Sequence, residues 1–180
     1  MTTQTITEAL AEIKTIGKRL IKKREFINQY VARQAVVRDP LLTQGGSVAV
    51  IAAERQAVHD LESRIVALRL AINAASVATT VTVGGEEHTI AWWLTWRREV
   101  VPARIAGNQL LQRHFVALRA QAQKDGMTLH PAAPADPQEK DVVINLNERE
   151  LAAEVEKMEE VLGTLDVLLS LKNATITITA

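Results

Sequence analysis

Few side chains in this 180-residue chain could carry chemistry, and their spacing does not assemble a catalytic or metal site. A stable metal site needs several converging ligands with supporting hydrogen bonds, and the histidines lack that spacing. The only local cluster is Glu86-Glu87-His88, and the remaining histidines are His59, His114 and His130. No serine lies in a nucleophile elbow, and the Gly-Gly pairs lack the lysine and strand of a phosphate loop. We therefore predict no catalytic residue, no metal, no cofactor and no enzymatic activity.

Basic side chains crowd the first helical pattern and form a candidate phosphate-binding surface. We call this surface the basic face; it consists of Lys14, Lys18, Arg19, Lys22 and Lys23. Lysine and arginine bind phosphates, but no aromatic platform for stacking bases accompanies the run. The chain as a whole holds 21 basic and 21 acidic residues, so no global charge draws it to nucleic acid or to an anionic membrane. Nucleic-acid contact through the basic face is therefore kept as an alternative function, and no membrane partner is expected.

A second interpretation of the basic face is pairing with an acidic helix. Residues 1–38 hold eight basic and three acidic residues, a net charge of +5, and residues 136–160 hold nine acidic and three basic residues, a net charge of −6. Opposite charge favours the first and last helices as neighbours, either within one chain or between chains.

The tryptophans Trp92, Trp93 and Trp96 lie close together on one predicted helix. At about 100° per residue, Trp92 and Trp96 fall opposite an apolar stripe of the same helix, and Trp93 lies at its flank. The stripe consists of Ile90, Leu94, Val101 and Ile105. A helix with two apolar faces is either internal to a bundle or docks on another subunit. Because tryptophan is enriched at interface hot spots, we predict a subunit contact at Trp92 and Trp96 and a core position for Trp93.

The composition is typical of long packed helices, because 47% of the residues are hydrophobic and only 3% are aromatic. We predict a mainly α fold of antiparallel helical hairpins in a coiled-coil-like bundle with short strands, forming one elongated module over 1–180. The absence of cysteine excludes disulfides and thiol chemistry. No apolar run approaches the ~20 residues of a membrane span, so we expect a soluble protein that is not secreted by the ordinary route.

The first predicted element is a helical hairpin over 5–75. A capping box, Thr5-Ile6-Thr7-Glu8, begins its first helix, and Asp39-Pro40 ends that helix. Gly45-Gly46-Ser47 supplies the turn and the cap of the second helix. Apolar residues recur every seven positions in both helices, which indicates a shared seam.

A strand and turn are predicted over 77–88, with the strand at Thr79–Val83 and the turn at Gly84-Gly85. A helix follows over 89–124, and Pro102 predicts either a kink or two helices meeting near Val100. The remaining predicted elements are a loop over 125–141, a strand over 142–146, a helix over 147–172 capped by Asn147 and Glu150, and a C-terminal strand over 174–179.

The terminal strand alternates isoleucine with threonine. A lone strand is barely stable in water, so the threonine-rich strands need each other or a neighbouring subunit. Because a short terminal strand suits edge addition, we predict Ile176 and Ile178 at a subunit interface.

The order of these features resembles the septicolysin-like family of small helical proteins of bacteria and their phages. The likeness covers residues 5–111 and 142–174. It rests on the capped first helix, on Ile-Asn-Ala-Ala before a threonine-rich strand, on T-I-x-x-x-L-x-x-R from Thr89 to Arg97, and on the leucine heptads of the last helix. The resemblance implies no enzyme and no cofactor. The family name suggests a thiol-dependent pore-forming toxin, from which this chain departs because it has no cysteine.

Phage relatives with a similar start, TITEALAEIKTIGKRLIKKREF from Thr5, suggest a phage gene. We therefore predict a structural protein in the virion of a tailed phage, as a capsid, connector or tail accessory subunit, assembled in the host cytoplasm. Its expected partners are further copies of itself and other virion proteins. The alternatives are a bacterial helical adaptor or septicolysin-like toxin.

Overall fold

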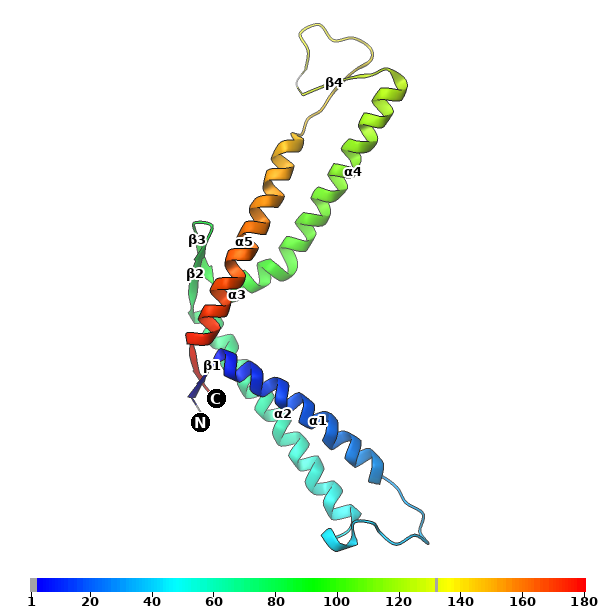
Figure 1. The fold of residues 1–180 in the computed structure, drawn as a ribbon, viewed down its shortest axis with the longest axis vertical. Helices are drawn as coiled ribbons and strands as arrows, with labels where there is room; N and C mark the ends of the chain where they lie inside the picture. The colour runs from blue at the N-terminus through cyan, green and yellow to red at the C-terminus, as the bar shows by residue number, and fades with distance from the viewer. Residues whose placement is uncertain (1–2, 132) are drawn as a thin grey trace. The chain divides into compact units, whose positions relative to one another are not determined.

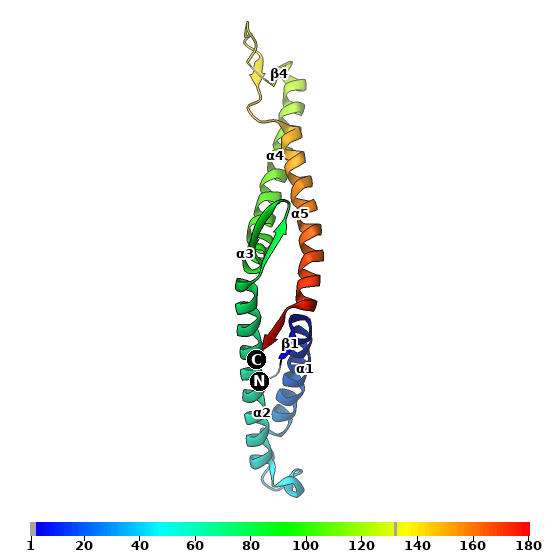
Figure 2. The same cartoon turned by 90° about the vertical axis from the view of Figure 1, so that its left-hand side faces the viewer.

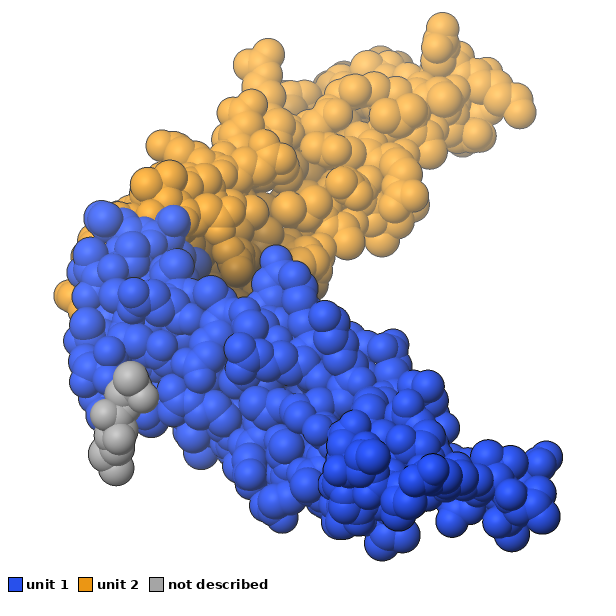
Figure 3. Space-filling view, turned by 60° about the horizontal axis from the view of Figure 1, so that its bottom comes forward, with its two compact units in different colours: residues 1–79, 169–180 blue, residues 80–168 orange. Residues whose placement is uncertain are grey.

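The protein is mainly α, as the sequence predicts: in the computed structural model, which describes residues 3–131 and 133–180, 70% of the residues are helical and the strands are short (Figure 1). Figure 2 shows the same elements from the side. The chain divides into two compact units, which Figure 3 distinguishes by colour. Unit 1 comprises residues 1–79 and 169–180, and unit 2 comprises residues 80–168. Whether the units fold together as one module stays a prediction.

Unit 1 is built on a helical hairpin. Helix α1 (Ile6–Tyr30) and helix α2 (Ser47–Ala78) run side by side in Figures 1 and 2, joined by a loop that holds the short 3-10 helix η1 (Leu42–Gln44). Strands β1 (Thr3–Thr5) and β6 (Thr177–Thr179) complete the unit. The predicted hairpin is confirmed, but α2 continues to Ala78 rather than ending at residue 75.

The start of α1 matches the predicted capping box, whereas its end does not match the predicted stop. The Glu8 N–H donates to Thr5 Oγ1 over 3.2 Å, and the Thr5 N–H donates to Glu8 Oε2 over 2.7 Å. The helix ends at Tyr30, well before Asp39-Pro40. Residues 31–38 are all exposed, so a longer helix would gain no buried face to offset its conformational entropy.

Asp39 organises the start of α2 instead of ending α1. Its carboxylate accepts the Leu41 N–H over 2.9 Å, the Ser47 N–H over 2.8 Å and the Ser47 hydroxyl over 2.5 Å. Gly46, rather than Ser47, occupies the N-cap position, with a φ of 88° that favours glycine. The hydrogen bonds from Ser47 and then Leu41 lower the pKa of Asp39 to about 2.

We expect this carboxylate to stabilise unit 1 in a pH-dependent way. Its folded pKa lies below the value of about 3.9 for an unfolded aspartate, so its stabilisation is complete above about pH 4 and is lost as the pH falls towards 2. Asp39→Asn should therefore lower the denaturation midpoint at neutral pH, and the difference from wild type should shrink between about pH 4 and pH 2. Urea titrations of both proteins at each pH measure this difference. A difference that stayed constant to pH 2 would contradict the role of the carboxylate.

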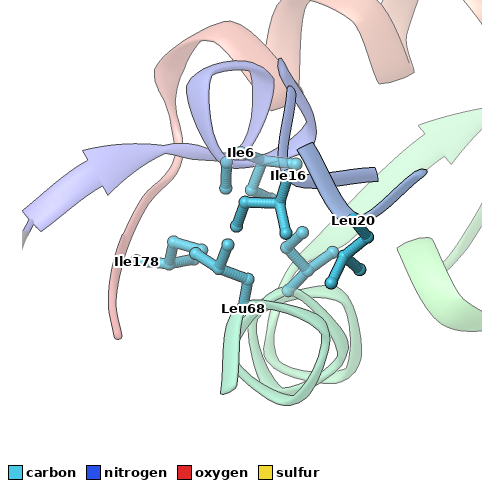
Figure 4. Packing of buried hydrophobic residues seen from close by; sticks show 7 residues of the cluster. Ile6, Ile16, Leu20, Leu68 and Ile178 are labelled. Carbon is cyan, nitrogen blue, oxygen red and sulfur yellow. The ribbon is translucent and has the colours of Figure 1, made fainter. Parts of the chain in front are cut away.

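The core of unit 1 joins both helices and the C-terminal strand. Figure 4 shows its buried side chains meeting. They are Ile6, Ala9, Ile16 and Leu20 of α1, Leu68 and Ile72 of α2, and Ile178 of β6. Strand β6 lies antiparallel to β1, with Ile178 opposite Gln4, and the Ile6 N–H donates to the Ile176 carbonyl over 3.1 Å. The sequence did not predict β1, which is too short to show a pattern of its own.

Unit 2 begins with a hairpin that leads into a broken helix. Strands β2 (Thr80–Val83) and β3 (Glu86–Thr89) pair antiparallel around Gly84-Gly85, whose φ angles of 59° and 87° confirm the predicted turn. The second strand occupies residues that were expected to form part of the turn. Helix α3 (Ile90–Thr95), the π-helix η2 (Trp96–Val100) and helix α4 (Val101–Asp125) follow.

The predicted interruption near Val100 is confirmed by η2. Pro102 lies in the first turn of α4 directly after η2, and its missing N–H cannot continue the α-helical hydrogen-bond pattern through this point. A π turn holds one more residue than an α turn. The side chains after η2 therefore lie on a different side of the helix than they would in an unbroken α-helix.

The end of unit 2 contains a small parallel sheet and the last helix. Strand β4 (Thr128–His130) lies within the predicted loop and pairs parallel with β5 (Asp141–Val143), which is shorter than the predicted strand. Helix α5 (Glu148–Thr175) begins where Asn147 Oδ1 accepts the Arg149 N–H over 3.0 Å, as the predicted cap requires. It continues past residue 172 and thereby shortens the terminal strand to β6. The buried hydrophobic residues of this unit include Val81, Val83, Ile90, Trp93, Val101, Phe115, Met158 and Leu165.

Candidate functional site

A pocket lined by the three tryptophans lies in unit 2, between the β2–β3 hairpin and helices α3, α4 and α5. We call it the tryptophan pocket, and its volume is about 440 Å³. Its lining consists of Val83, Gly84, Glu86, Trp92, Trp93, Trp96, Arg104, Glu154, Lys157, Met158 and Val161. Concave, largely apolar sites with a few polar groups at the edge are typical binding sites.

The indole of Trp93 attaches α3 to the hairpin. Its side chain is 2% exposed, and its Nε1–H donates to the Val81 carbonyl over 3.1 Å. The N-cap Thr89 directs α3 away from β3, because its Oγ1 accepts the Trp92 N–H over 3.1 Å. Trp93 therefore belongs to the core, as predicted.

The other two indoles form the outer part of the cluster. Trp92 is 40% exposed and stacks on His88, with ring centroids 3.8 Å apart and an interplanar angle of 17°. Trp96 is half-buried and nearly parallel to Trp92, at a centroid distance of 6.5 Å. Trp93 stands perpendicular to both, with interplanar angles of 89°. The two indoles predicted at a subunit contact are thus accessible but also contact one another and the hairpin.

The predicted apolar stripe of this helix is only partly right. Ile90 and Val101 are buried, but Leu94 is exposed. The hairpin covers the face that holds Ile90 and Trp93, which are three positions apart, and η2 then brings Val101 back to the buried side. The hairpin determines which face of α3 is buried. The sequence did not predict the second strand of this hairpin, so it did not predict that face.

Charged side chains surround the tryptophan pocket. Arg104, Glu154 and Lys157 are exposed and form no ion pair with another residue in the described part of the chain. Glu86 lies 3.5 Å from His88 Nε2. The lining includes aromatic, aliphatic and charged groups but no hydroxyl or thiol side chain. Such a pocket can bind a side chain of mixed polarity, and it contains no hydroxyl or thiol nucleophile.

The basic face lies on α1 and is mostly free of ion pairs. Lys14, Lys18, Arg19 and Lys22 are exposed. Lys23 differs, because it is half-buried and its Nζ lies 2.7 Å from Glu54 of α2. Two further ion pairs, Arg24–Glu62 at 2.7 Å and Arg64–Glu12 at 2.8 Å, also join α1 to α2. Hydrogen bonds from Arg64 and Gln4 lower the pKa of Glu12.

The predicted pairing of α1 with the last helix, within one chain or between chains, stays a prediction. The ion pairs of α5 are Arg97–Asp166 and Arg119–Glu148, both inside unit 2. The ion pairs that α1 forms with α2 lie inside unit 1, where the two helices run side by side in the hairpin.

Ile176 and Ile178 contribute to the packing of unit 1. Ile178 is buried in the core of unit 1, and Ile176 packs against that core. Strand β6 pairs with β1 in a two-stranded sheet, so within the described residues one edge of β6 is paired. The role of Ile176 and Ile178 at a subunit contact stays a prediction.

In the described ranges, no three His, Cys, Asp or Glu side chains converge as metal ligands. His130 Nε2 lies 3.0 Å from Asp141 Oδ1, a contact between the β4 and β5 strands. None of the helices in residues 3–131 and 133–180 combines the length and apolar character needed to cross a membrane.

Comparison with known proteins does not place the chain in a family: no family model, no curated protein and no solved structure matches it. The resemblance to the septicolysin-like family therefore stays a prediction.

Proposed function

We propose that the protein is a non-enzymatic structural protein that assembles with further copies of itself in the virion of a tailed phage. The observation that carries the proposal is the set of aliphatic side chains on the outer faces of its long helices, each more than half exposed. These residues are Ile21, Val66, Leu70, Leu110, Val116, Val167 and Leu171. Association with a further copy would remove such side chains from water.

Unit 2 adds a further apolar surface. A groove of about 530 Å³ lies between α4 and residues 143–146, lined chiefly by Leu111, Phe115, Leu118, Val143 and Leu146. Burial of apolar surface contributes about 25 cal/mol per Å², so surfaces of this kind favour association. The tryptophan pocket, with its two accessible indoles, supports the same interpretation.

Mass spectrometry of purified virions tests the location. The proposal expects this protein in particles at a fixed ratio to the major capsid protein. Its absence from particles, combined with recovery from the cytoplasm of the host, would favour the alternative of a bacterial helical adaptor.

The accessible tryptophans should matter for assembly. Trp92→Ala and Trp96→Ala should each weaken self-association by about 2 kcal/mol or more, because a rigid, partly exposed indole is the side chain most enriched at interface hot spots. Sedimentation velocity over a range of concentrations measures association, and thermal unfolding at low concentration measures the monomer.

The conservative variant Trp92→Phe keeps a flat ring and serves as the control, with a smaller expected loss. If the alanine variants lowered the unfolding temperature of the monomer but left association unchanged, Trp92 and Trp96 would be internal to the bundle.

A further inference from the structure

We propose that the outer face of α1 binds the outer face of α5 from a second copy, with the two helices antiparallel. The inference rests on the self-assembly proposed above and names the two surfaces that meet. Four observations carry it: two unpaired charged rows, their matching spacing, a glycine in open space, and the ion pairs inside unit 1.

The α1 surface is the part of the basic face that the chain does not use. Lys14, Lys18 and Lys22 repeat every four residues, so they form one row on the helix. They are exposed, and no carboxylate lies within ion-pair distance of them in the part of the chain that the structure describes. The ion pairs between α1 and α2 involve other residues, because Glu54 and Glu62 bind Lys23 and Arg24.

The α5 surface is acidic and turned away from its own unit. Glu156 and Glu160 lie about 180° around the helix from buried Met158, at 100° per residue. Both are exposed, and neither forms an ion pair with a described residue. Val167 continues the same row and is also exposed.

A glycine lies in the middle of this row. A side chain added at Gly163 would meet nothing within 4 Å. Glycine in a helix costs roughly 1 kcal/mol relative to alanine. Because glycine has no side chain, a partner helix could lie close to α5 at this point.

The two rows have the same spacing, which is identical in both directions, so spacing permits either alignment and the charges decide between them. On α1 the row runs Lys22, Lys18, Thr15 and Ala11, with steps of four, three and four residues. On α5 it runs Glu156, Glu160, Gly163 and Val167, with the same steps. All eight residues are exposed.

Antiparallel alignment therefore places complementary residues opposite each other. Lys22 faces Glu156 and Lys18 faces Glu160, so both charge pairs form. Thr15 faces Gly163 and Ala11 faces Val167, so the other half of the contact is small or apolar and lets the helices approach. Parallel alignment would set the glutamates against Ala11 and Thr15 and leave both lysines without an acid, so charge selects the antiparallel arrangement.

Each copy carries one face of each kind. Two copies that exchange both contacts would form an isologous, two-fold dimer; otherwise the contact is heterologous and either closes into a larger ring or continues along a series of copies. Because the charged half lies at the surface, salt should weaken the contact.

Charge exchange between two variants tests the pairing. One variant carries Lys18→Glu and Lys22→Glu, and the other carries Glu156→Lys and Glu160→Lys. Each alone sets like charges against each other and should lose about tenfold or more in association at ~0.05 M salt. An equimolar mixture restores opposite charges at both contacts, so it should associate within about threefold of wild type.

A matched control is Arg55→Glu with Arg69→Glu, which makes the same charge change at exposed positions of α2. Its association should stay near that of wild type, and far-UV circular dichroism should show all variants folded. Loss of association in the separate variants with recovery in the mixture supports the pairing. If wild type associates and the exchange has no effect, or the mixture fails to recover, the pairing is wrong while self-assembly stands. If wild type stays monomeric throughout, self-assembly and the pairing both fail.

Discussion

Replacing Trp93 with alanine is expected to destabilise unit 2 by about 3–5 kcal/mol, the usual cost of truncating a large buried aromatic side chain. The indole is almost completely buried and contacts both Trp92 and Trp96 edge-on. Its Nε1–H also satisfies the Val81 carbonyl, which would be left without that donor in the variant. Both effects act on the junction between the β2–β3 hairpin and α3, so the loss should unfold the tryptophan pocket.

Urea denaturation followed by circular dichroism measures this loss. Trp93→Phe keeps one aromatic ring but loses the N–H and part of the indole volume, so its cost should be clearly smaller than that of alanine. Trp92→Ala is the exposed control and should change monomer stability much less. Equal stability of Trp93→Ala and wild type would show that α3 is held to the hairpin by other contacts.

The second large effect is expected at the C-terminus. Ile178→Ala should destabilise unit 1 by about 2–4 kcal/mol, because it leaves a cavity among tightly packed side chains of both helices. The sequence alone predicts the opposite outcome: removal of residues 174–180 would spare the helices and impair only assembly. Since β6 pairs with β1 and covers the core of unit 1, that deletion should instead lower the unfolding temperature.

Thermal unfolding at a concentration where the protein is monomeric separates the two outcomes. Thr177→Ala and Thr179→Ala provide matched controls on the same strand, because both side chains are exposed while Ile178 is buried. If Ile178→Ala retained the wild-type unfolding temperature and lost only self-association, the terminal strand would belong to a subunit contact after all.

Only part of the tryptophan pocket could be predicted from the sequence. The burial of Trp93 and the exposure of Trp92 follow from helical geometry, so this difference could be predicted, whereas the subunit contact at Trp92 stays a prediction. The pocket itself could not, because its walls come from a hairpin and from α5, far along the chain. The stacking of His88 on Trp92 needed strand β3, which places the histidine beside the first turn of α3.

What the sequence determined by itself is local. The Thr5–Glu8 capping box, the Gly84-Gly85 turn and the interruption at Pro102 depend on backbone conformations and hydrogen bonds within a few residues, so residue type and spacing specify them. The heptad seams of α1, α2 and α5 belong to the same class, because period alone distinguishes a helix from a strand.

Tertiary structure decided the features whose free energy comes from residues distant in sequence. Asp39 caps α2 across a loop, and β1 forms only because β6 lies beside it. Leu94 is exposed although it lies near Ile90 on α3, because the hairpin covers only the side that holds Ile90 and Trp93. Ile178 is a core residue for the same reason. A short strand is too unstable by itself to fix its own position, so the packing against α1 and α2 determines where it lies.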